Sequence, residues 1–286
     1  MFVSGKTKVL GVFGHPVGHS LSPVMHNAVI ESLGLNYVYV PFDVTPENLT
    51  QALCGVCALG VSGVNVTIPH KEAVIELLDE VAGDAREVGS VNTIVNIDGR
   101  LTGMSTDGAG FLRSLEESGF SPEGKTAVVL GAGGSGRAVT FALAKAGAEV
   151  TVFSRSLTKA ERLAEDIRSL GRECGAGDIS RLQTLCSGLE ADLLVNCTPV
   201  GMYPDIGKTP VPAEALRRGM VVYDLVYNPV KTALLEAAEA AGAQTVNGLD
   251  MLVYQGALSF KIWTGIEPLI HTMKAALMKR LGSSSR

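Results

Sequence analysis

A glycine-rich segment, GAGGSG at residues 131–136, constrains the fold of this chain more than any other feature. It follows the apolar run TAVVL and precedes a helical pattern whose small and apolar side chains share one face. The spacing G-x-G-x-x-G between a strand and a helix is typical of dinucleotide-binding turns, because glycines let the backbone turn tightly and approach a pyrophosphate at the helix N-terminus. We predict a dinucleotide site, rather than a merely structural turn, at Gly131, Ala132, Gly133, Gly134, Ser135 and Gly136.

The end of the next predicted strand, in VFSRSLTKA, indicates which dinucleotide binds. An NAD site usually places an acidic residue here to hold the ribose hydroxyls, but the first acid in this stretch is Glu161. Arg155 can donate forked hydrogen bonds to a 2′-phosphate and stack on adenine, and Lys159 adds positive charge. Ser154 and Ser156 add neutral hydrogen bonds. The sequence therefore favours NADP; the alternative is an ordinary solvated basic loop.

The rest of the chain alternates apolar runs with helical periods, which predicts an α/β protein with largely parallel sheets. A length of 286 residues suits two domains. We expect a substrate-binding and catalytic domain over residues 1–106, completed by helices in 248–286, and a Rossmann-type doubly wound sheet over 107–247, with a cleft between them. The pair Asp98–Gly99 between two apolar runs predicts a tight hairpin, and hence a local antiparallel excursion.

Composition narrows the possible partners. Hydrophobic residues make up 46% of the chain and charged residues 19%, which indicates a compact globule. Aromatic residues are only 5% and the net charge is −5, which argues against a nucleic-acid surface. We therefore expect a small-molecule ligand. No apolar run approaches the roughly 18 residues of a membrane span, and the N-terminus lacks the apolar stretch of a signal peptide, so we expect a cytoplasmic protein. The histidines and cysteines lack metal-ligand spacing, so no metal is expected.

Two serines in FGHPVGHSLSP, residues 13–23, suggest an anion site in the first domain. Pro23 favours the first turn of a helix, and Ser22 before it is a good N-cap. The hydroxyls of Ser20 and Ser22, with a helix N-terminus behind them, suit a carboxylate on a small substrate. The alternative is that Ser22 only caps the helix and Ser20 only shapes the turn.

Further polar residues follow other predicted strands of the same domain. Thr67 closes the strand in VNVTIPHKEAV, and Lys71 is expected to open the next helix, where a lysine opposes the macrodipole and so invites a functional explanation. Asn92 begins SVNTIV, and Asp107 lies at the expected domain crossing; a turn residue and a helix cap are their plain alternatives. Ligands of open α/β sheets bind outside the carboxyl ends of strands, so these side chains are candidates for one site.

Several motifs at these positions resemble the shikimate dehydrogenases, in order and over essentially the whole chain: GHPVGHSLSP, GVNVTIPHK, VNTI, STDGAGF, GAGGSGRA, NCTPVGM, DLVYNP and GLDMLVYQGA. The resemblance implies an oxidoreductase acting on a CH–OH group, which reversibly reduces 3-dehydroshikimate to shikimate with NADP in aromatic amino-acid (chorismate) biosynthesis. It leaves a monomer or a homodimer open. An NAD-dependent quinate/shikimate dehydrogenase and a non-catalytic dinucleotide-binding sensor are the alternatives.

The resemblance also implies roles for individual residues. Lys71 and Asp107 match the paired catalytic residues, with Lys71 exchanging the proton and Asp107 orienting it. The implied substrate contacts are Ser20, Ser22 and Tyr227 for the carboxylate, and Thr67, Asn92, Asp107 and Gln255 for the ring hydroxyls. The implied cofactor contacts beyond the glycine-rich turn are Arg155 at the 2′-phosphate, Thr198 in NCTPVGM, and Gly248 and Met251 at the nicotinamide. The family pattern NRTxxR reads SRSLTK here, so Ser154 and Lys159 depart from it.

Overall fold

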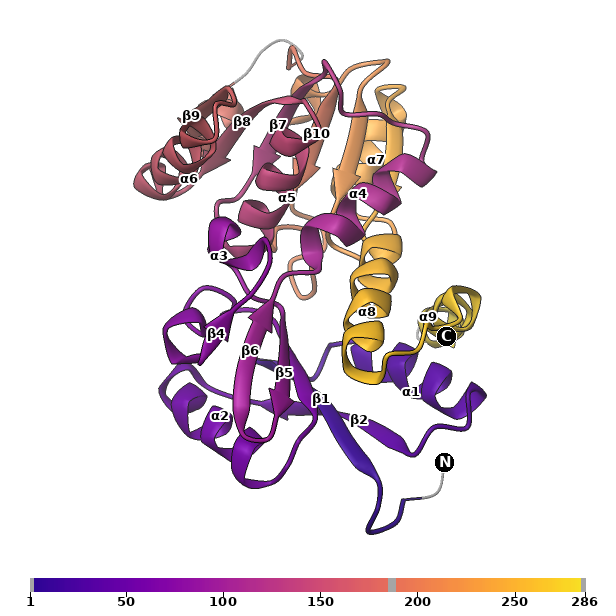
Figure 1. Ribbon diagram of the computed structural model, residues 1–286. Coiled ribbons are helices and arrows are strands. Elements are labelled where there is room, and N and C mark those ends of the chain that lie inside the picture. The colour runs from indigo at the N-terminus through magenta and orange to yellow at the C-terminus, as the bar shows by residue number, and fades with distance from the viewer. Residues whose placement is uncertain (1–2, 185–188, 284–286) are drawn as a thin grey trace. The chain divides into compact units, whose positions relative to one another are not determined.

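The computed structural model describes residues 3–184 and 189–283 and divides the chain into two compact units (Figure 1). The first unit consists of Met1–Gly110 and Leu252–Arg286, and the second of Phe111–Met251. None of the helices in the described ranges is long and apolar enough to cross a membrane.

The first unit contains a mixed six-stranded sheet in the order β2-β1-β3-β5-β6-β4. β1 pairs in parallel with β2 and β3, whereas β5 runs antiparallel to both β3 and β6. The predicted hairpin joins β5 to β6, and Asp98 and Gly99 both have positive φ, as a tight turn of this kind requires. The strands are β1 (Lys8–Gly14), β2 (Tyr37–Asp43), β3 (Gly63–Val66), β4 (Glu80–Val81), β5 (Thr93–Ile97) and β6 (Arg100–Met104).

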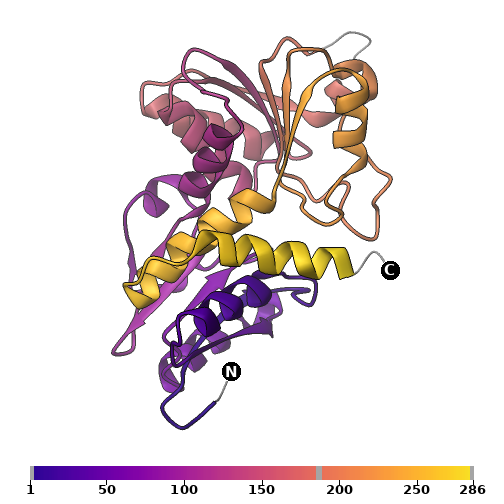
Figure 2. The ribbon, with the colours of Figure 1, turned by 90° about the vertical axis from the view of Figure 1, so that its right-hand side faces the viewer.

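Helices from both ends of the chain cover this sheet. The C-terminal helix α9 packs against α1 within this unit (Figure 2). Val64, Val66 and Ile94 are buried in an apolar core on the side of α2. The helices are α1 (Ser22–Ser32), α2 (Leu49–Ala58) after a 3₁₀ turn at Pro46–Asn48, α3 (Ala85–Val88), α8 (Leu249–Thr264) and α9 (Ile270–Ser283).

Two local predictions in the first unit are wrong. Ser22 is the first residue of α1 instead of its N-cap; Leu21 takes the cap position, and no side chain caps the helix there. Lys71 does not open an α-helix, because it lies in a series of turns that leads to a 3₁₀ helix at Ile75–Leu77. The carbonyl of Lys71 accepts from the Val91 N–H at 2.9 Å, and this non-local bond takes the place of a helical one. No macrodipole opposes Lys71.

The second unit contains a parallel six-stranded sheet in the order β12-β11-β10-β7-β8-β9. Read from β9, this is the order 3-2-1-4-5-6 of a doubly wound Rossmann-type sheet, so the predicted fold class is confirmed. β9 and β12 were not among the predicted strands. The strands are β7 (Thr126–Leu130), β8 (Glu149–Ser154), β9 (Cys174–Asp178), β10 (Leu193–Asn196), β11 (Val221–Asp224) and β12 (Gln244–Asn247).

The helices of the second unit follow its strands and bury their apolar faces. α5 (Gly134–Lys145) follows β7, α6 (Leu157–Ser169) follows β8, and α7 (Ala233–Ala240) precedes β12. The helix α4 (Asp107–Glu117) leads from the first unit into the second. Because strand ends of a parallel sheet meet at one edge, the loops after β7, β8, β10 and β11 gather there.

Candidate active site

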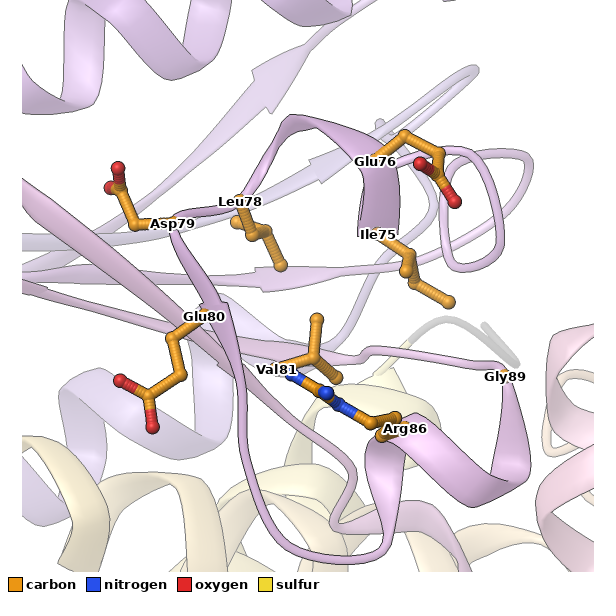
Figure 3. A pocket seen from close by; sticks show the side chains of 8 residues that line it. All are labelled: Ile75, Glu76, Leu78, Asp79, Glu80, Val81, Arg86 and Gly89. Atoms are coloured by element: carbon orange, nitrogen blue, oxygen red, sulfur yellow. The ribbon is translucent and has the colours of Figure 1, made fainter.

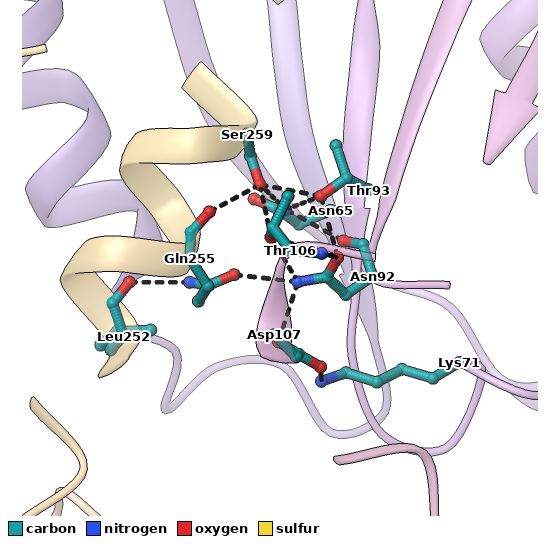
Figure 4. Close-up of polar contacts among 9 residues, drawn as sticks. All are labelled: Asn65, Lys71, Asn92, Thr93, Thr106, Asp107, Leu252, Gln255 and Ser259. Atoms are coloured by element: carbon teal, nitrogen blue, oxygen red, sulfur yellow. Dashed lines mark hydrogen bonds and ion pairs between the residues drawn. The ribbon is translucent and has the colours of Figure 1, made fainter. Parts of the chain in front are cut away.

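The side chains of Lys71 and Asp107 form an ion pair in the first unit (Figure 4). Lys71 Nζ lies 2.5 Å from Asp107 Oδ2, and the side chains are 12% and 4% exposed. Lys71 comes from the turn after β3, and Asp107 begins α4, where the helix N-terminus favours a carboxylate. A charge-assisted hydrogen bond in this shielded setting holds a cationic amine and a carboxylate at a defined distance.

Asn92 fixes the other oxygen of Asp107. Its Nδ2 donates to Asp107 Oδ1 at 2.8 Å, and its Oδ1 accepts from the backbone N–H of Thr106 at 2.8 Å. Because a backbone N–H only donates, the orientation of the amide is determined, and the amide nitrogen faces Asp107. The plain alternative of a turn residue therefore does not account for Asn92, which is buried and bonded on both sides.

Gln255 reaches this group from α8, far along the chain. Its Oε1 accepts from Asn92 Nδ2 at 3.1 Å, and its Nε2 donates to the carbonyl of Leu252 at 2.7 Å. A Cβ on Gly110 would lie 2.6 Å from the backbone nitrogen of Gln255, so only glycine permits this approach of α8. The structure thus brings together four of the predicted residues, Lys71, Asn92, Asp107 and Gln255.

The remaining predicted residues of the first unit follow two strands that pair in parallel. Ser20 and Ser22 come after β1, and Thr67 comes directly after β3. The Ser22 N–H donates to Ser20 Oγ at 3.3 Å. The Ser22 side chain lowers the pKa of the Tyr39 hydroxyl, against the larger effect of burial, which raises it. Thr67 is half-buried, and its N–H donates to the Phe13 carbonyl at 2.8 Å. These hydroxyls lie at strand ends, as predicted.

The glycine-rich turn of the second unit has the backbone that its spacing predicts. Gly131 has a φ of +104°, and a Cβ on Gly136 would lie 2.0 Å from the Gly131 carbonyl oxygen. Gly133 takes the N-cap position of α5. A Cβ on Gly131 would lie 3.3 Å from Cys197 and Thr198, so the loops after the adjacent strands β7 and β10 meet here. This is the switch point of the sheet, where such folds bind their ligand.

The predicted 2′-phosphate residues surround the start of α6. Ser154 ends β8 and is buried, whereas the side chains of Arg155 and Lys159 are exposed. Ser156 is the N-cap of α6, and its Oγ accepts from the Lys159 N–H at 3.4 Å. The basic residues are thus presented outward next to a helix N-terminus.

The other predicted residues of the second unit lie after β10, β11 and β12. Thr198 Oγ1 donates to Asn196 Oδ1 at 2.6 Å, and Tyr227 is half-buried in the segment after β11. Gly248 has a packing reason to be glycine, since a Cβ there would lie 2.2 Å from the Leu225 carbonyl oxygen. Met251 is buried in the first turn of α8.

Asp224, at the end of β11, was missed by sequence reasoning. It is fully buried and accepts from Asn196 Nδ2 at 2.9 Å, the Val226 N–H at 3.0 Å and Thr232 Oγ1 at 2.6 Å. Burial raises the pKa of this carboxyl to about 6, although the hydrogen bonds oppose the shift. Asp224 therefore ties together the loops that carry Thr198 and Tyr227.

A pocket elsewhere in the first unit involves none of the predicted residues (Figure 3). Two of its carboxylates are already engaged: Asp79 accepts from the Leu101 N–H at 2.7 Å, and Glu80 lies 3.3 Å from the guanidinium of Arg100. The pocket is lined by Ile75, Glu76, Leu78, Asp79, Glu80, Val81, Arg86 and Gly89.

Three segments of the chain match known protein families. Residues 12–94 match the shikimate dehydrogenase substrate binding domain, and residues 248–278 match the shikimate 5′-dehydrogenase C-terminal domain. Residues 127–209 match the saccharopine dehydrogenase NADP binding domain. The first two matches contain Lys71, Asn92 and Gln255, whereas Asp107 lies outside them, and the third contains the glycine-rich turn.

The whole chain is also similar to individual proteins. The shikimate dehydrogenase (NADP(+)) of Methanopyrus kandleri is 50% identical over 283 residues, which cover 98% of both chains. A solved shikimate dehydrogenase in complex with NADP+ superposes with a TM-score of 0.91 at 47% identity, covering 98% of both chains. The shikimate 5-dehydrogenase of Thermus thermophilus, in complex with NADP(H) and shikimate, gives a TM-score of 0.85 at 42% identity over 96% of this chain and 99% of that one.

Proposed function

The chain belongs to the shikimate dehydrogenase family, and we propose that Lys71 and Asp107 are the catalytic pair with which it interconverts 3-dehydroshikimate and shikimate using NADP. The observation that carries this proposal is the buried contact of 2.5 Å between Lys71 Nζ and Asp107 Oδ2, held by Asn92. The geometry supports an acid–base role because it gives one ammonium group a fixed, partly shielded position beside its counter-charge.

Lys71 is proposed to supply the proton. Reduction of a ketone builds negative charge on the oxygen, and the ammonium group of Lys71 stabilises that charge and then donates a proton to it. Asp107 keeps the amine oriented and hydrogen-bonds a neighbouring substrate hydroxyl through the same carboxylate. In the oxidative direction, Lys71 takes the proton back. The cofactor supplies or accepts the hydride.

The second unit is proposed to hold NADP. The turn over residues 131–136 fits a pyrophosphate because its glycines leave space that Cβ atoms would fill, and α5 presents its N-terminus there. Arg155 and Lys159, with the hydroxyls of Ser154 and Ser156, are proposed to hold the 2′-phosphate. Thr198, Gly248 and Met251 are proposed to complete the cofactor site.

The first unit is proposed to hold the substrate. Ser20 and Ser22 suit its carboxylate because hydroxyl donors lie beside the first turn of α1. Thr67, Asn92 and Gln255 suit the ring hydroxyls, and Tyr227 of the second unit is proposed to assist at the carboxylate. We further propose that the catalytic domain comprises residues 1–106 and 248–286, that 107–247 form the NADP domain, and that the enzyme works in the cytoplasm as a monomer or homodimer.

The test is a comparison of initial rates with shikimate and quinate, each with NADP and NAD, followed by absorbance of the reduced nucleotide. We expect shikimate with NADP to give the highest kcat/KM. A preference for quinate with NAD would instead identify a quinate/shikimate dehydrogenase. The absence of turnover with all four combinations, in a folded protein that still binds NADP, would identify a non-catalytic sensor.

A further inference from the structure

A layer of buried polar side chains lies directly beneath the Lys71–Asp107 group (Figure 4 draws most of it). Its members come from four separate elements of the first unit, and each is almost completely shielded from solvent. None was among the predicted site residues. They are Tyr39 on β2, Asn65 on β3, Thr93 on β5 and Ser259 on α8.

Asn65 is the centre of this layer. Its Nδ2 lies 3.0 Å from the Asn92 carbonyl and 3.0 Å from Ser259 Oγ, and its Oδ1 lies 2.7 Å from the hydroxyl of Tyr39. A carbonyl only accepts, so the atom facing Asn92 is the amide nitrogen, and Tyr39 must donate its proton to the amide oxygen. A leucine-sized apolar residue at this position would remove one hydrogen bond from each of these groups and would leave the buried hydroxyl of Tyr39 without this acceptor.

Tyr39 is the end of the layer nearest the proposed carboxylate site. Burial raises the pKa of its hydroxyl, and the side chain of Ser22 opposes that shift. The hydroxyl of Tyr39 gives its single proton to Asn65 Oδ1 at 2.7 Å.

Ser259 extends the layer in the opposite direction. Its hydroxyl donates to the Gln255 carbonyl at 3.0 Å. The hydroxyl of Thr93 accepts from Asn65 Nδ2 at 3.3 Å. Thr93 in turn donates to Asn92 Oδ1 at 3.1 Å. One continuous chain of buried hydrogen bonds therefore runs from Tyr39 through Asn65 to both Asn92 and Gln255.

We propose that Tyr39 and Asn65 are positioning residues that hold Asn92 and Gln255, the proposed hydroxyl-binding amides, in place at the substrate site. This inference rests on the proposed function for the roles of Asn92 and Gln255. Neither positioning residue touches the reacting atoms; each acts through the residues it holds. Substrate affinity should therefore depend on them more than the chemical step does.

The first test is Tyr39→Phe, which removes the hydroxyl that donates to Asn65 and keeps the ring. We expect the KM for shikimate to rise about tenfold, the equivalent of one lost hydrogen bond, with kcat within about threefold and the KM for NADP within about twofold. Tyr37→Phe is the matched control, since Tyr37 lies on the same strand and its ring faces the amine of Lys8. Its kinetics should match those of the unaltered enzyme.

The second test is Ser259→Ala, which also covers the case in which Tyr39→Phe does not fold. We expect a severalfold rise in the KM for shikimate at nearly constant kcat. Thr264→Val, on the same helix, is the control because it removes the same kind of bond, from the Thr264 hydroxyl to the Phe260 carbonyl at 2.8 Å, outside the layer. The double variant should raise KM by less than the product of the single effects, because both act through Asn65.

The outcomes separate this inference from the proposed function. If the unaltered enzyme does not oxidise shikimate, the proposed function is wrong, and the positioning role falls with it. If it does, and a folded Tyr39→Phe or Ser259→Ala enzyme keeps the KM for shikimate of its control, the layer only stabilises the fold. Similar losses of kcat, of affinity for shikimate and of affinity for NADP would also overturn the inference, because they would indicate that the variant destabilises the whole structure.

Discussion

The two units differ in which part of the chain forms their proposed binding sites. In the first unit, long side chains from four segments meet in one hydrogen-bonded group, which ends in the ion pair of Lys71 and Asp107. In the second, glycines expose the backbone, and the absence of Cβ atoms creates the site. The first arrangement depends on the identity of each polar group, whereas the second depends on free space. Substitutions should therefore affect the two units in different ways.

Their buried ionisable groups differ as well. In the first unit, burial lowers the pKa of His26 to about 3, so this imidazole is neutral in the folded state. In the second, burial raises the pKa of Asp224 to about 6. A fall in pH therefore lowers the folding stability of the first unit, because of His26, and raises that of the second, because of Asp224. The comparison between the units can be tested both by substitution and by pH.

The largest effect is expected from Lys71→Ala. Removal of the ammonium group should lower kcat by about 10² to 10⁴, with only a modest rise in the KM for shikimate, because the proton donor is lost while the serines and amides remain. The measurement is steady-state kinetics with shikimate and NADP. Lys261→Ala, at an exposed ion pair with Glu267, is the control. A folded Lys71→Ala enzyme with unchanged kcat would contradict the assignment of the proton donor.

Gly136→Ala probes the second unit in the same way. The added Cβ would lie 2.0 Å from the Gly131 carbonyl oxygen, so the turn must open, and we expect the KM for NADP to rise by about 10- to 100-fold. Binding of shikimate should persist and can be followed by the fluorescence of Trp263, the single tryptophan, which lies in the first unit. Gly207→Ala is the control, because a Cβ there would have open space around it, and it should leave the binding of both NADP and shikimate unchanged. Unaltered NADP kinetics in Gly136→Ala would show that free space is not what this turn provides.

The same contrast explains which features the sequence could predict. The glycine-rich turn was predictable because the demand on its backbone is local, and the parallel strands around it carry continuous apolar runs. β9 was missed because its sequence, CGAGD, has no such run; Gly177 leaves space for the ring of Phe153, whose atoms come within 2.4 Å of where a Cβ would lie. Pairing with the neighbouring strand β8, more than the local β propensity of the sequence, makes this segment a strand.

In the first unit, local reasoning found the outer residues and missed the layer beneath them. Lys71 and Asp107 follow recognisable strands and Asn92 directly precedes one. Ser259 lies on α8, and only the fold brings it to Asn65. One signal was available: Asn65 interrupts the otherwise apolar strand GVNV, and a polar residue in a fully buried strand needs a partner. The wrong expectation for Lys71 arose because a long-range bond replaced the local helix.

A smaller effect is expected from His26→Phe, measured as stability against pH. The ring of His26 stacks on Tyr39 at 4.3 Å, and neither of its nitrogens has a hydrogen-bond partner in the described part of the chain. The folded pKa of about 3 lies below the unfolded value of 6.5, so the unfolded state takes up a proton first and stability falls as pH drops below 6.5. At pH 4.5 the loss is roughly 3 kcal/mol.

In the His26→Phe protein, this acid-dependent loss should disappear from urea unfolding followed by Trp263 fluorescence. The control is His271→Gln, because His271 is exposed on α9 and its replacement should leave the pH dependence intact. If the first unit of the His26→Phe protein still lost stability between pH 6.5 and 4.5 as steeply as the unaltered protein, another group would be responsible.

Asp224→Asn should change the pH dependence in the opposite sense and by less. The folded pKa of about 6 lies above the ordinary value of 3.8, so the folded state holds the proton more tightly, and stability falls as pH rises from about 4 through 6. The full change is roughly 3 kcal/mol, part of which the amide variant should recover at pH 7. An amide at this position can still accept from Asn196 and Val226 and can donate to Thr232, whose hydroxyl then accepts.

The measurement for Asp224→Asn is amide hydrogen exchange of β11 at pH 5 and pH 7. In the unaltered protein, the stability of β11 derived from hydrogen exchange should be lower at pH 7 than at pH 5. The variant should remove this difference in β11. In β1 and β3 of the first unit, the variant should leave the stability difference between the two pH values unchanged. Asp192→Asn serves as the control, because Asp192 is only partly buried and directly precedes the neighbouring strand β10, at the end opposite to Asp224. If the variant altered both units equally, the buried groups of the two units would be coupled, and the contrast drawn between them would fail.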